Sequence, residues 1–184
     1  MSACPTVETE RLILRPFRES DVDGYAEMLQ TPEVRASLHL PDDVGREQAW
    51  NGIASWLGQW ELRGTGQWAV EERATGAFVG RAGMHWPERD DWPGIEIGWA
   101  FHPRSWGNGY ATEAGASSVG YAFAHHDVDA LYSVILPENK RSEGVAQRLG
   151  FTLFETRITS HFPESPHGIW RLPRDRRTLT YGTL

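Results

Sequence analysis

Alternating hydrophobic residues predict a β-strand over residues 95–101, immediately before a turn that contains two glycines. A period of two places successive side chains on opposite faces of a strand. His102 and Pro103 end the strand, and the following segment has apolar side chains at helical spacing up to about His126. The segment therefore runs from strand through turn to helix. One strand face carries Ile95, Ile97, Trp99 and Phe101, and the other carries Glu96, Gly98 and Ala100.

The remaining hydrophobic pattern predicts further strands and helices in an irregular order. Ser20 and Asn139 are suitable N-cap residues, Pro32 marks the end of the first helix, and Gly150 ends the last one. Gly115 and Gly120 interrupt the helix after the glycine turn, so we expect its backbone to lie close against a sheet there. The pattern favours strands over residues 11–17, 67–72, 78–86, 130–136, 151–158 and 169–172, and helices over 20–30, 46–62 and 139–149.

This order of elements predicts a mixed α/β fold of the α+β type. It is neither a regular alternation nor an all-antiparallel list, and the count gives about seven strands flanked by about four helices. The crossover from Glu96 to Leu136 should be right-handed and should place its two strands parallel. In the 46–62 helix, the residues expected to face the core are Trp50, Ile53, Leu57 and Trp60.

Composition narrows the class of protein. The 184 residues, 40% of them hydrophobic, suit a single domain spanning 1–184. No apolar run approaches the roughly 20 residues of a membrane helix, and the N-terminus lacks a signal-peptide pattern, so we expect a cytoplasmic protein with no membrane partner. Cys4 is the only cysteine, which excludes an internal disulfide. The net charge of −7 argues against nucleic acid as a partner and is compatible with a cationic acceptor.

The turn after the 95–101 strand has the features of an anion site. Gly107 and Gly109 let the backbone approach a ligand, and the first amides of the next helix lack partners and carry the positive end of its dipole. A phosphate or pyrophosphate would satisfy them. A dinucleotide fingerprint is an alternative, but Thr112 stands in place of its third glycine and Pro103 separates the glycines from the strand. A plain turn before a helix remains open on the glycines alone.

The sequence WGNGYATEA, after a strand ending in FHP, resembles the acyl-CoA turn of the GNAT family of N-acetyltransferases, and most of all its ribosomal-protein alanine acetyltransferase branch. The family pattern of Arg or Gln, two residues, Gly, one residue, then Gly or Ala falls on Trp106, Gly109 and Ala111. Trp106 departs from the general pattern but is familiar in that branch. The resemblance implies that backbone amides hold the pyrophosphate of acetyl-CoA. It assigns cofactor contacts to Phe101, Trp106, Gly107, Asn108, Gly109, Tyr110, Ala111, Thr112, Asn139 and Ser142.

A second motif, PENKRS followed by VAQRLGF, also resembles the alanine acetyltransferase branch. The resemblance implies that Asn139 contacts the pantetheine or adenine end of the cofactor and that Ser142 lies near the sulfur. Asn139 could instead be a helix cap alone, and Ser142 a first-turn polar residue. Many family members carry a tyrosine general acid in this helix, where this chain has Ala146, which excludes a tyrosine acid from that position.

The resemblance extends from ETERLILRP to RLGF, almost the whole chain, and implies that the strands before and after the crossover splay apart around the pantetheine arm. Attack on a thioester needs a neutral amine and an oxyanion donor. Glu96 is our candidate base, because partial burial would raise its pKa toward neutrality; a salt-bridged strand carboxylate is the alternative. A backbone amide near Phe101 is the candidate oxyanion donor. Ser142 is the candidate acid, although a thiolate with a pKa of about 8.5 leaves readily without one.

The sequence therefore favours an acetyl-CoA-dependent N-acetyltransferase, in which an amine attacks directly in a ternary complex. The acceptor is a small-molecule amine or a protein N-terminus, and the protein is a monomer or a homodimer. A non-catalytic CoA-binding sensor or partner-docking protein is the main alternative, and a nicotinamide-binding oxidoreductase is a third. No metal is expected, because His125 and His126 have no spaced carboxylate or cysteine beside them. Trp86 and Trp92, which bracket an acidic loop, are candidates to face the acceptor.

Overall fold

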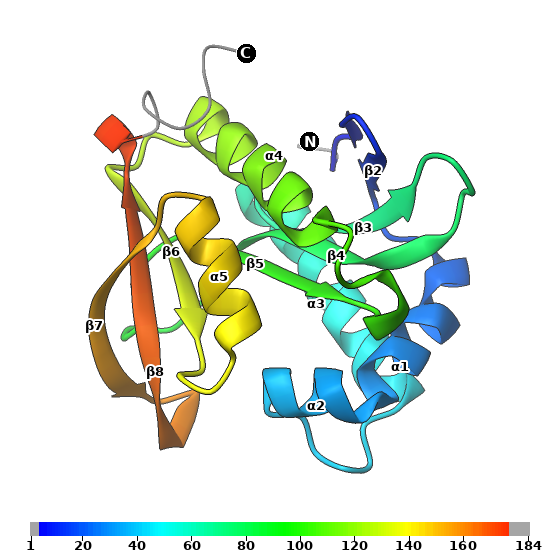
Figure 1. Ribbon diagram of the computed structural model, residues 1–184, viewed down its shortest axis with the longest axis horizontal. Coiled ribbons are helices and arrows are strands. Elements are labelled where there is room, and N and C mark those ends of the chain that lie inside the picture. Colours follow the sequence, from blue (N-terminus) through cyan, green and yellow to red (C-terminus); the bar gives the residue numbers. More distant parts are fainter. Residues whose placement is uncertain (1–3, 177–184) are drawn as a thin grey trace.

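The computed structural model describes residues 4–176 and folds around one eight-stranded sheet (Figure 1). The strand order is β1-β2-β3-β4-β5-β6-β8-β7. Only β5 and β6 pair in parallel, and every other pair is antiparallel. The strands are β1 (Val7–Glu8), β2 (Leu12–Arg15), β3 (Gln67–Glu72), β4 (Phe78–His85), β5 (Glu96–Phe101), β6 (Ala130–Ile135), β7 (Thr152–Thr159) and β8 (Phe162–Pro173).

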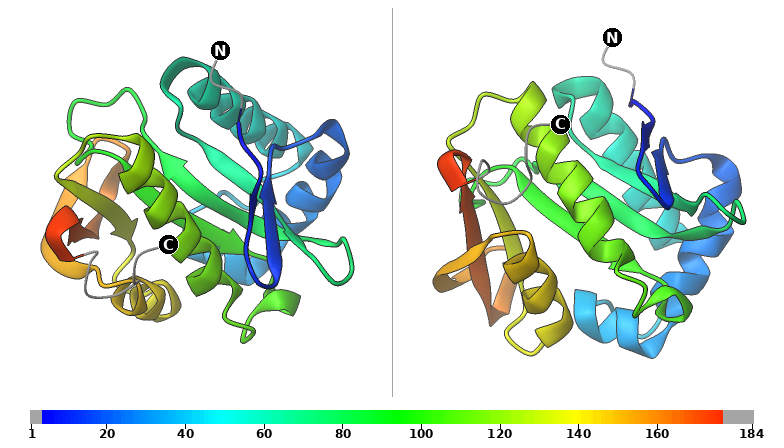
Figure 2. Two further views of the ribbon diagram at one scale, coloured as in Figure 1. Left: turned by 90° about the horizontal axis from the view of Figure 1, so that it is seen from above. Right: turned by 45° about the horizontal axis from the view of Figure 1, so that its top comes forward.

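The helices lie on both faces of the sheet (Figure 2). Helix α4 packs on β4 and β5 on one face, with α5 beside it, and α3 lies on the opposite face with α1 against it. The β5 alternation separates the two layers, since Ile97 and Phe101 join the core under α4 while Ala100 joins the core under α1 and α3. The helices are α1 (Val22–Gln30), α2 (Pro32–Leu38), α3 (Arg46–Arg63), α4 (Tyr110–His125) and α5 (Lys140–Arg148).

The predicted mixed α/β class is confirmed, with two additions to the predicted elements. The short β1 brings the strands to eight, and α2 brings the helices to five. Helix α1 ends at Gln30, just before Pro32, as expected. Pro32 also begins α2, because proline is tolerated in the first turn, where its missing N–H is not needed. Ser20 lies in a 3₁₀ turn, and Asp21 precedes α1. Strand β8 begins at Phe162, seven residues before the predicted start.

The predicted core face of α3 was partly wrong. Trp50 is 48% exposed and Leu57 is 39% exposed, whereas Ile53 and Trp60 are buried as expected. The buried stripe is completed by Ala49 and Trp56, which lie on the same side of the helix as Ile53 and Trp60. Trp56 packs against Phe17 and Tyr25 with ring centroids 5.4 and 5.5 Å apart. Contacts with α1 therefore decide which tryptophan is buried.

Gly115 allows a close approach, but not to the sheet. A Cβ atom at this position would lie 2.7 Å from Cδ1 of Leu149, at the end of α5. The glycine therefore lets α4 pack against α5, which helps to hold the two helices that flank the functional site.

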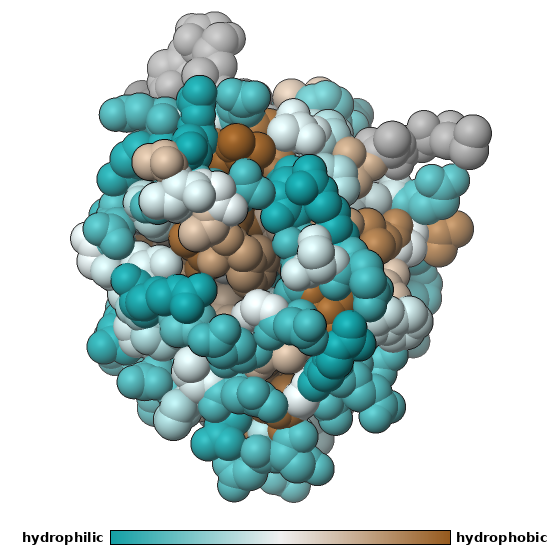
Figure 3. All heavy atoms as spheres, turned by 90° about the vertical axis from the view of Figure 1, so that its right-hand side faces the viewer, coloured by the Kyte–Doolittle hydropathy of each residue, from teal (hydrophilic) through white to brown (hydrophobic). Residues whose placement is uncertain are grey.

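The surface is mixed in character. On the face shown in Figure 3, hydrophilic side chains surround smaller apolar areas. None of the helices between residues 4 and 176 is both long and apolar enough to cross a bilayer.

Candidate active site

The two parallel strands β5 and β6 diverge, and their divergence opens the site. Their register contains one pair, Glu96 with Tyr132, and the amide of Tyr132 donates to the Ile95 carbonyl at 3.0 Å. Beyond Glu96, β5 continues in register with β4, while β6 continues in register with β8. The splay predicted from the family resemblance is therefore present, and polar backbone groups of β5 face it.

A cleft of about 950 Å³ runs through this splay. We call its two parts the coenzyme end and the acceptor end. The coenzyme end is formed by the glycine turn and by α5, including Trp106, Gly107, Gly109, Ala111, Thr112, Asn139, Ser142 and Arg148. The acceptor end is formed by α1–α3, β4, β5 and the β7–β8 turn, including Tyr25, Trp56, Gln67, Arg81, His85, Arg89, Trp92, Glu96, His161 and His167.

The glycine turn at the coenzyme end is built for a backbone ligand. Gly107 has φ of 81° and Gly109 has φ of 78°, values that favour glycine. Gly109 precedes α4 as its N-cap and gives it no side-chain cap. A Cβ at Gly107 would meet nothing within 4 Å, so the backbone faces open space. Uncapped amides at a helix start suit a phosphate group, and the turn therefore fits the diphosphate of coenzyme A.

Side chains around the turn hold it in place. The Nε1 atom of Trp106 donates to the Phe101 carbonyl at 2.9 Å, and Arg141 stacks on its indole at 4.3 Å. The Nη1 atom of Arg11 donates to the Asn108 carbonyl at 2.8 Å. The Asn108 side chain donates to the Ser105 carbonyl at 3.2 Å, and Asn108 does not line the cleft. The Asn108 side chain therefore shapes the turn, and the predicted contact of Asn108 with the cofactor stays a prediction.

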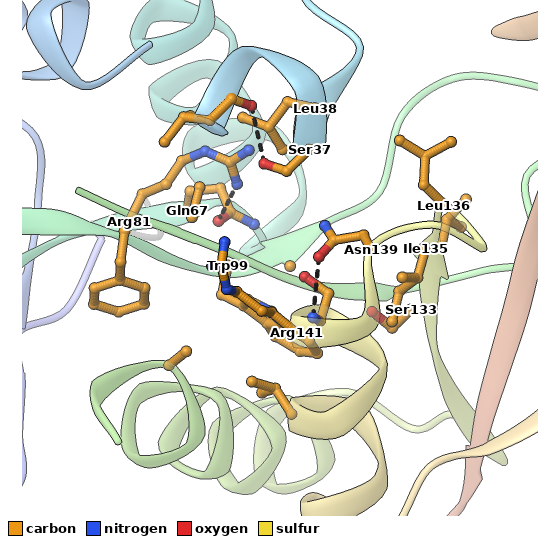
Figure 4. Close-up of a pocket in the computed structure, with 18 of the residues that line it drawn as sticks. Ser37, Leu38, Gln67, Arg81, Trp99, Ser133, Ile135, Leu136, Asn139 and Arg141 are labelled. Carbon is orange, nitrogen blue, oxygen red and sulfur yellow. Dashed lines mark hydrogen bonds between the residues drawn. The ribbon is translucent and has the colours of Figure 1, made fainter. Parts of the chain in front are cut away.

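Helix α5 brings the second motif to the same cleft. The Oδ1 atom of Asn139 accepts from the Ser142 amide at 3.1 Å, so Asn139 is the helix cap (Figure 4). Asn139 and Ser142 also line the cleft. Ala146 is fully buried, and so this position presents no acid to the site.

The backbone of Phe101 faces the splay. The amide of the next residue, His102, donates to the Val79 carbonyl of the strand on the other side of β5 at 3.0 Å. Because N–H and C=O groups alternate in direction along a strand, the N–H and C=O of Phe101 point away from β4. The Phe101 carbonyl accepts from the Trp106 indole, and the Phe101 N–H lies on the side of the cleft. This amide therefore remains the candidate oxyanion donor.

Glu96 is a weakly partnered carboxylate between the two ends of the cleft. Burial raises the pKa of Glu96 to about 7, against the opposing effects of the Val134 amide, Arg81 and Arg89. Its carboxylate accepts a long hydrogen bond, 3.4 Å, from the Val134 amide. Within residues 4–176 it forms no ion pair within 4 Å, which removes the salt-bridge alternative. A carboxylate with this pKa can take a proton near neutral pH.

His85 lies beside Glu96 as its register partner on β4. Burial is the main cause that lowers the pKa of His85 to about 3, so its imidazole is neutral at physiological pH. Its Nδ1 atom accepts from Nε2 of Gln59 at 3.2 Å. The neighbour of Glu96 is therefore an uncharged ring, which adds to the low polarity around the carboxylate.

Arg81 lines the acceptor end but was not predicted from the sequence. Arg81 bonds to the Tyr25 hydroxyl at 3.2 Å and to the Gln67 amide oxygen at 2.9 Å (Figure 4), and it stacks on Trp56 at 5.0 Å. It pairs in register with Ala100, on the face of β5 that carries Glu96. A correct register for the β4–β5 pair could have found it, but register is not visible in the strand pattern alone.

The two tryptophans expected to face the acceptor lie in different places. Trp92 lines the cleft and lies 5.9 Å from His85 and 6.2 Å from His161, measured between ring centroids. Trp86 lies outside the cleft wall and is covered on one face by the Arg63 guanidinium at 5.4 Å. The hypothesis for Trp86 was therefore wrong, because the loop turns only its second tryptophan inward.

The sequence matches a known protein family over most of its length. The sequence profile of the Acetyltransferase (GNAT) domain covers residues 11–152. The chain belongs to the GNAT acetyltransferase family. Among curated proteins, it is similar to the uncharacterized N-acetyltransferase YoaA of Bacillus subtilis, with 27% identity over 80% of this chain and 82% of that protein.

Solved structures agree with this family. An acetyltransferase from Agrobacterium tumefaciens is 30% identical, with a TM-score of 0.80, over 92% of this chain and 95% of the other. RimL, a ribosomal L7/L12 α-N-protein acetyltransferase solved with coenzyme A, has a TM-score of 0.77 at 16% identity, over 93% and 99% of the two chains. At that identity the likeness to RimL concerns the fold alone. The family and the fold together support acetyl transfer as the general activity.

Proposed function

We propose that this protein transfers the acetyl group of acetyl-CoA to a primary amine, with Glu96 as general base. The observation that carries the proposal is the position of Glu96, whose pKa is raised to about 7 by burial, in the same cleft as the glycine turn. A carboxylate of this kind is rare outside functional sites, because burial without a partner destabilises the folded state.

Acetyl-CoA would lie along the coenzyme end. The amides between Trp106 and Ala111 would bind its diphosphate, and the pantetheine arm would follow the splay past Asn139 toward Glu96. The Phe101 N–H would then face the thioester carbonyl. The coenzyme can take this position without displacing a side chain, because the turn and the splay border the same cleft.

The chemical step is direct attack. The neutral amine forms a C–N bond to the acetyl carbon, and Glu96 takes the proton that the nitrogen loses. The Phe101 amide donates to the oxyanion of the tetrahedral intermediate. The C–S bond then breaks, and the thiolate leaves with its electron pair and takes a proton from Ser142 or from solvent. A thiol pKa of about 8.5 makes Ser142 the less important of the two side chains.

The acceptor is a protein N-terminus or a small-molecule amine. The PENKRS motif supports the ribosomal-protein alanine acetyltransferase branch. Fold alone does not choose an acceptor, because one fold serves many substrates. The chemistry of the acceptor end provides the stronger guide.

Thiol release from acetyl-CoA tests the proposal. Purified protein is incubated with acetyl-CoA and a panel of amines and peptides, and free thiol is followed beside Glu96→Gln and the exposed control Glu47→Gln. We expect acceptor-dependent release that Glu96→Gln reduces at least about 100-fold without loss of CoA affinity, a size typical for a general base. Coenzyme binding without turnover on any acceptor would instead support a CoA-binding sensor.

A further inference from the structure

Two hydrogen-bond donors at the acceptor end have no protein acceptor. The Nη1 atom of Arg89 and the Nε1 atom of Trp92 are both buried, and neither donates to a residue in the described part of the chain. The two side chains are in contact, with the guanidinium carbon of Arg89 5.0 Å from the Trp92 ring centroid. Both line the cleft that contains Glu96. A buried donor left without an acceptor is costly, so an oxygen-bearing ligand group would stabilise both.

Arg89 also lacks a charge partner. Among residues 4–176, no carboxylate lies within 4 Å of its guanidinium nitrogens. Asp91, two residues away, is directed elsewhere, since its two carboxylate oxygens accept from the amide and the hydroxyl of Ser160 at 2.5 and 3.0 Å. Desolvation lowers the pKa of Arg89, but a guanidinium stays charged at neutral pH. A partly buried cation without a counter-ion favours an anionic ligand.

Arg81 adds a second positive charge on the same side of Glu96. Its Nε and Nη1 atoms are used by Tyr25 and Gln67, both neutral, and no carboxylate among the described residues lies within 4 Å of it. Both arginines act electrostatically on Glu96. Two arginines without a carboxylate partner within 4 Å therefore lie at the acceptor end, in contrast to the net charge of −7 of the whole chain.

The loop that carries the two donors is fixed by other contacts. Besides the Asp91–Ser160 bonds, the Nη2 atom of Arg157 donates to the Asp91 carbonyl at 2.7 Å. These bonds attach the β4–β5 loop to the β7–β8 hairpin. The backbone between Arg89 and Trp92 is thereby held at Asp91, and such preorganisation of the loop lowers the entropic cost of binding.

We propose, on the basis of the proposed N-acetyltransferase function, that the acceptor is an amine that carries a carboxylate, bound by Arg89 and Trp92 while its nitrogen lies at Glu96. A guanidinium and an indole N–H can donate together to the two oxygens of a carboxylate. Arg81 contributes long-range attraction. Polyamines and other acceptors with a second cation near the amine are disfavoured, because that cation would face two arginines. The carboxylate can belong to a free amino acid or to an acidic residue at a peptide N-terminus.

Matched acceptor pairs test this proposal. Each L-amino acid is compared with its α-carboxamide, and C-terminally amidated peptides beginning Asp-Ala are compared with those beginning Asn-Ala. The kcat/KM of each is measured for wild type, Arg89→Gln, Trp92→Phe and the exposed control Arg46→Gln. We expect Arg89→Gln to lower kcat/KM about 10- to 100-fold for the carboxylate member and less than about threefold for the neutral member, as loss of a charge-assisted bond predicts. Trp92→Phe should cost about fivefold on the same member.

The two members of a pair differ in the pKa of the amine. The decisive quantity is therefore the ratio of variant to wild-type kcat/KM, taken for one acceptor at a time. Arg89→Lys retains the charge without the planar fork and should give an intermediate loss. Whichever pair responds identifies the source of the carboxylate. Equal losses on both members, or no loss on either, would overturn the carboxylate site.

A binding measurement separates this proposal from the proposed function. The same acceptor pairs are titrated by calorimetry into CoA-loaded wild type and Arg89→Gln. Carboxylate-selective binding that Arg89→Gln removes, without thiol release, would support the site and contradict the transferase assignment. Turnover on neutral amines without carboxylate selectivity would support the transferase assignment and contradict the carboxylate site. A wild type that neither binds nor acetylates any carboxylate in the panel overturns the proposal, and circular dichroism confirms that each variant is folded.

Discussion

The indole Nε1 of Trp106 donates a 2.9 Å hydrogen bond to the carbonyl of Phe101, and so joins the glycine turn to the end of β5. The GNAT pattern has Arg or Gln at this position, which suggests a side chain directed at the coenzyme. Here the side chain anchors the turn to the strand, which agrees with our proposal that backbone amides bind the coenzyme. The departure of Trp106 from the family pattern therefore has a structural explanation.

Trp106→Phe tests this anchor. The variant keeps the ring under Arg141 and loses the bond to Phe101, so we expect a CoA dissociation constant about fivefold higher, equivalent to one hydrogen bond. Isothermal calorimetry measures the change. The matched control is Trp50→Phe on the exposed side of α3, which should leave affinity unchanged. An unaltered affinity in Trp106→Phe would show that the turn holds its shape without the indole.

Arg11 is expected to support the turn from the N-terminal strand. It donates to the Asn108 carbonyl at 2.8 Å and to Oε2 of Glu113 at 2.7 Å, and it is largely exposed. Arg11→Gln should therefore weaken CoA binding only about two- to fivefold, the size expected for an exposed charge-assisted contact. Arg73→Gln is the control, because Arg73 contacts Thr9 and Glu8 and not the turn. A loss of affinity in the control as large as in Arg11→Gln would argue for a general effect on the N-terminal strands.

Asn139 combines a structural role with a predicted coenzyme contact, and two substitutions separate them. Asn139→Ala should lower the free energy of unfolding by about 1 kcal/mol, because α5 loses its N-cap. Asn139→Asp keeps an oxygen that can accept from the Ser142 amide, and it should restore stability. Urea unfolding and CoA calorimetry are measured on both. If Asp restores affinity together with stability, capping alone explains the residue.

Much of the fold was visible in the sequence because regular patterns dominate it. Strand β3 and the ends of α3 and α4 were placed within a residue or two by the apolar spacing and by Gly64, whose φ of 65° ends α3. Residues 162–168 of β8 were missed, since His161, Pro163 and Pro166 do not alternate with apolar residues. Their strand conformation comes from pairing with β7, a tertiary contact that local sequence does not encode.

The two ends of the site differed in how far they could be predicted. The coenzyme end follows from contiguous motifs, so the Trp106–Ala111 turn and the Asn139 cap were found together. The acceptor end is assembled from α1–α3, β4 and a hairpin distant in sequence, and Arg81 and Arg89 belong to no motif. Glu96 was found because small neighbours share its face of β5. Its surroundings depend on strand register and on one loop, which only the folded chain fixes.

The raised pKa of Glu96 carries a prediction about stability. Its folded-state pKa of about 7 lies above the ordinary value of 4.5, so the folded protein binds the proton more tightly than the unfolded chain does. This contribution is fully present below pH 4.5 and is lost as the pH rises to about 7. Glu96→Gln cannot titrate, and it should gain about 2 kcal/mol in unfolding free energy relative to wild type between pH 5 and pH 8. Urea unfolding at both pH values measures the difference, and a constant difference would place Glu96 in contact with water.

The pH dependence of kcat/KM in wild type and Glu96→Gln tests the role of the base most directly. Deprotonation of the free amine affects both proteins equally, so the ratio of their kcat/KM values isolates the residue. If Glu96 is the base, the ratio of wild-type kcat/KM to Glu96→Gln kcat/KM rises about tenfold per pH unit below pH 7 and then levels, following the Glu96 pKa of about 7. A ratio that stays constant from pH 5.5 to pH 9 would contradict Glu96 as the base.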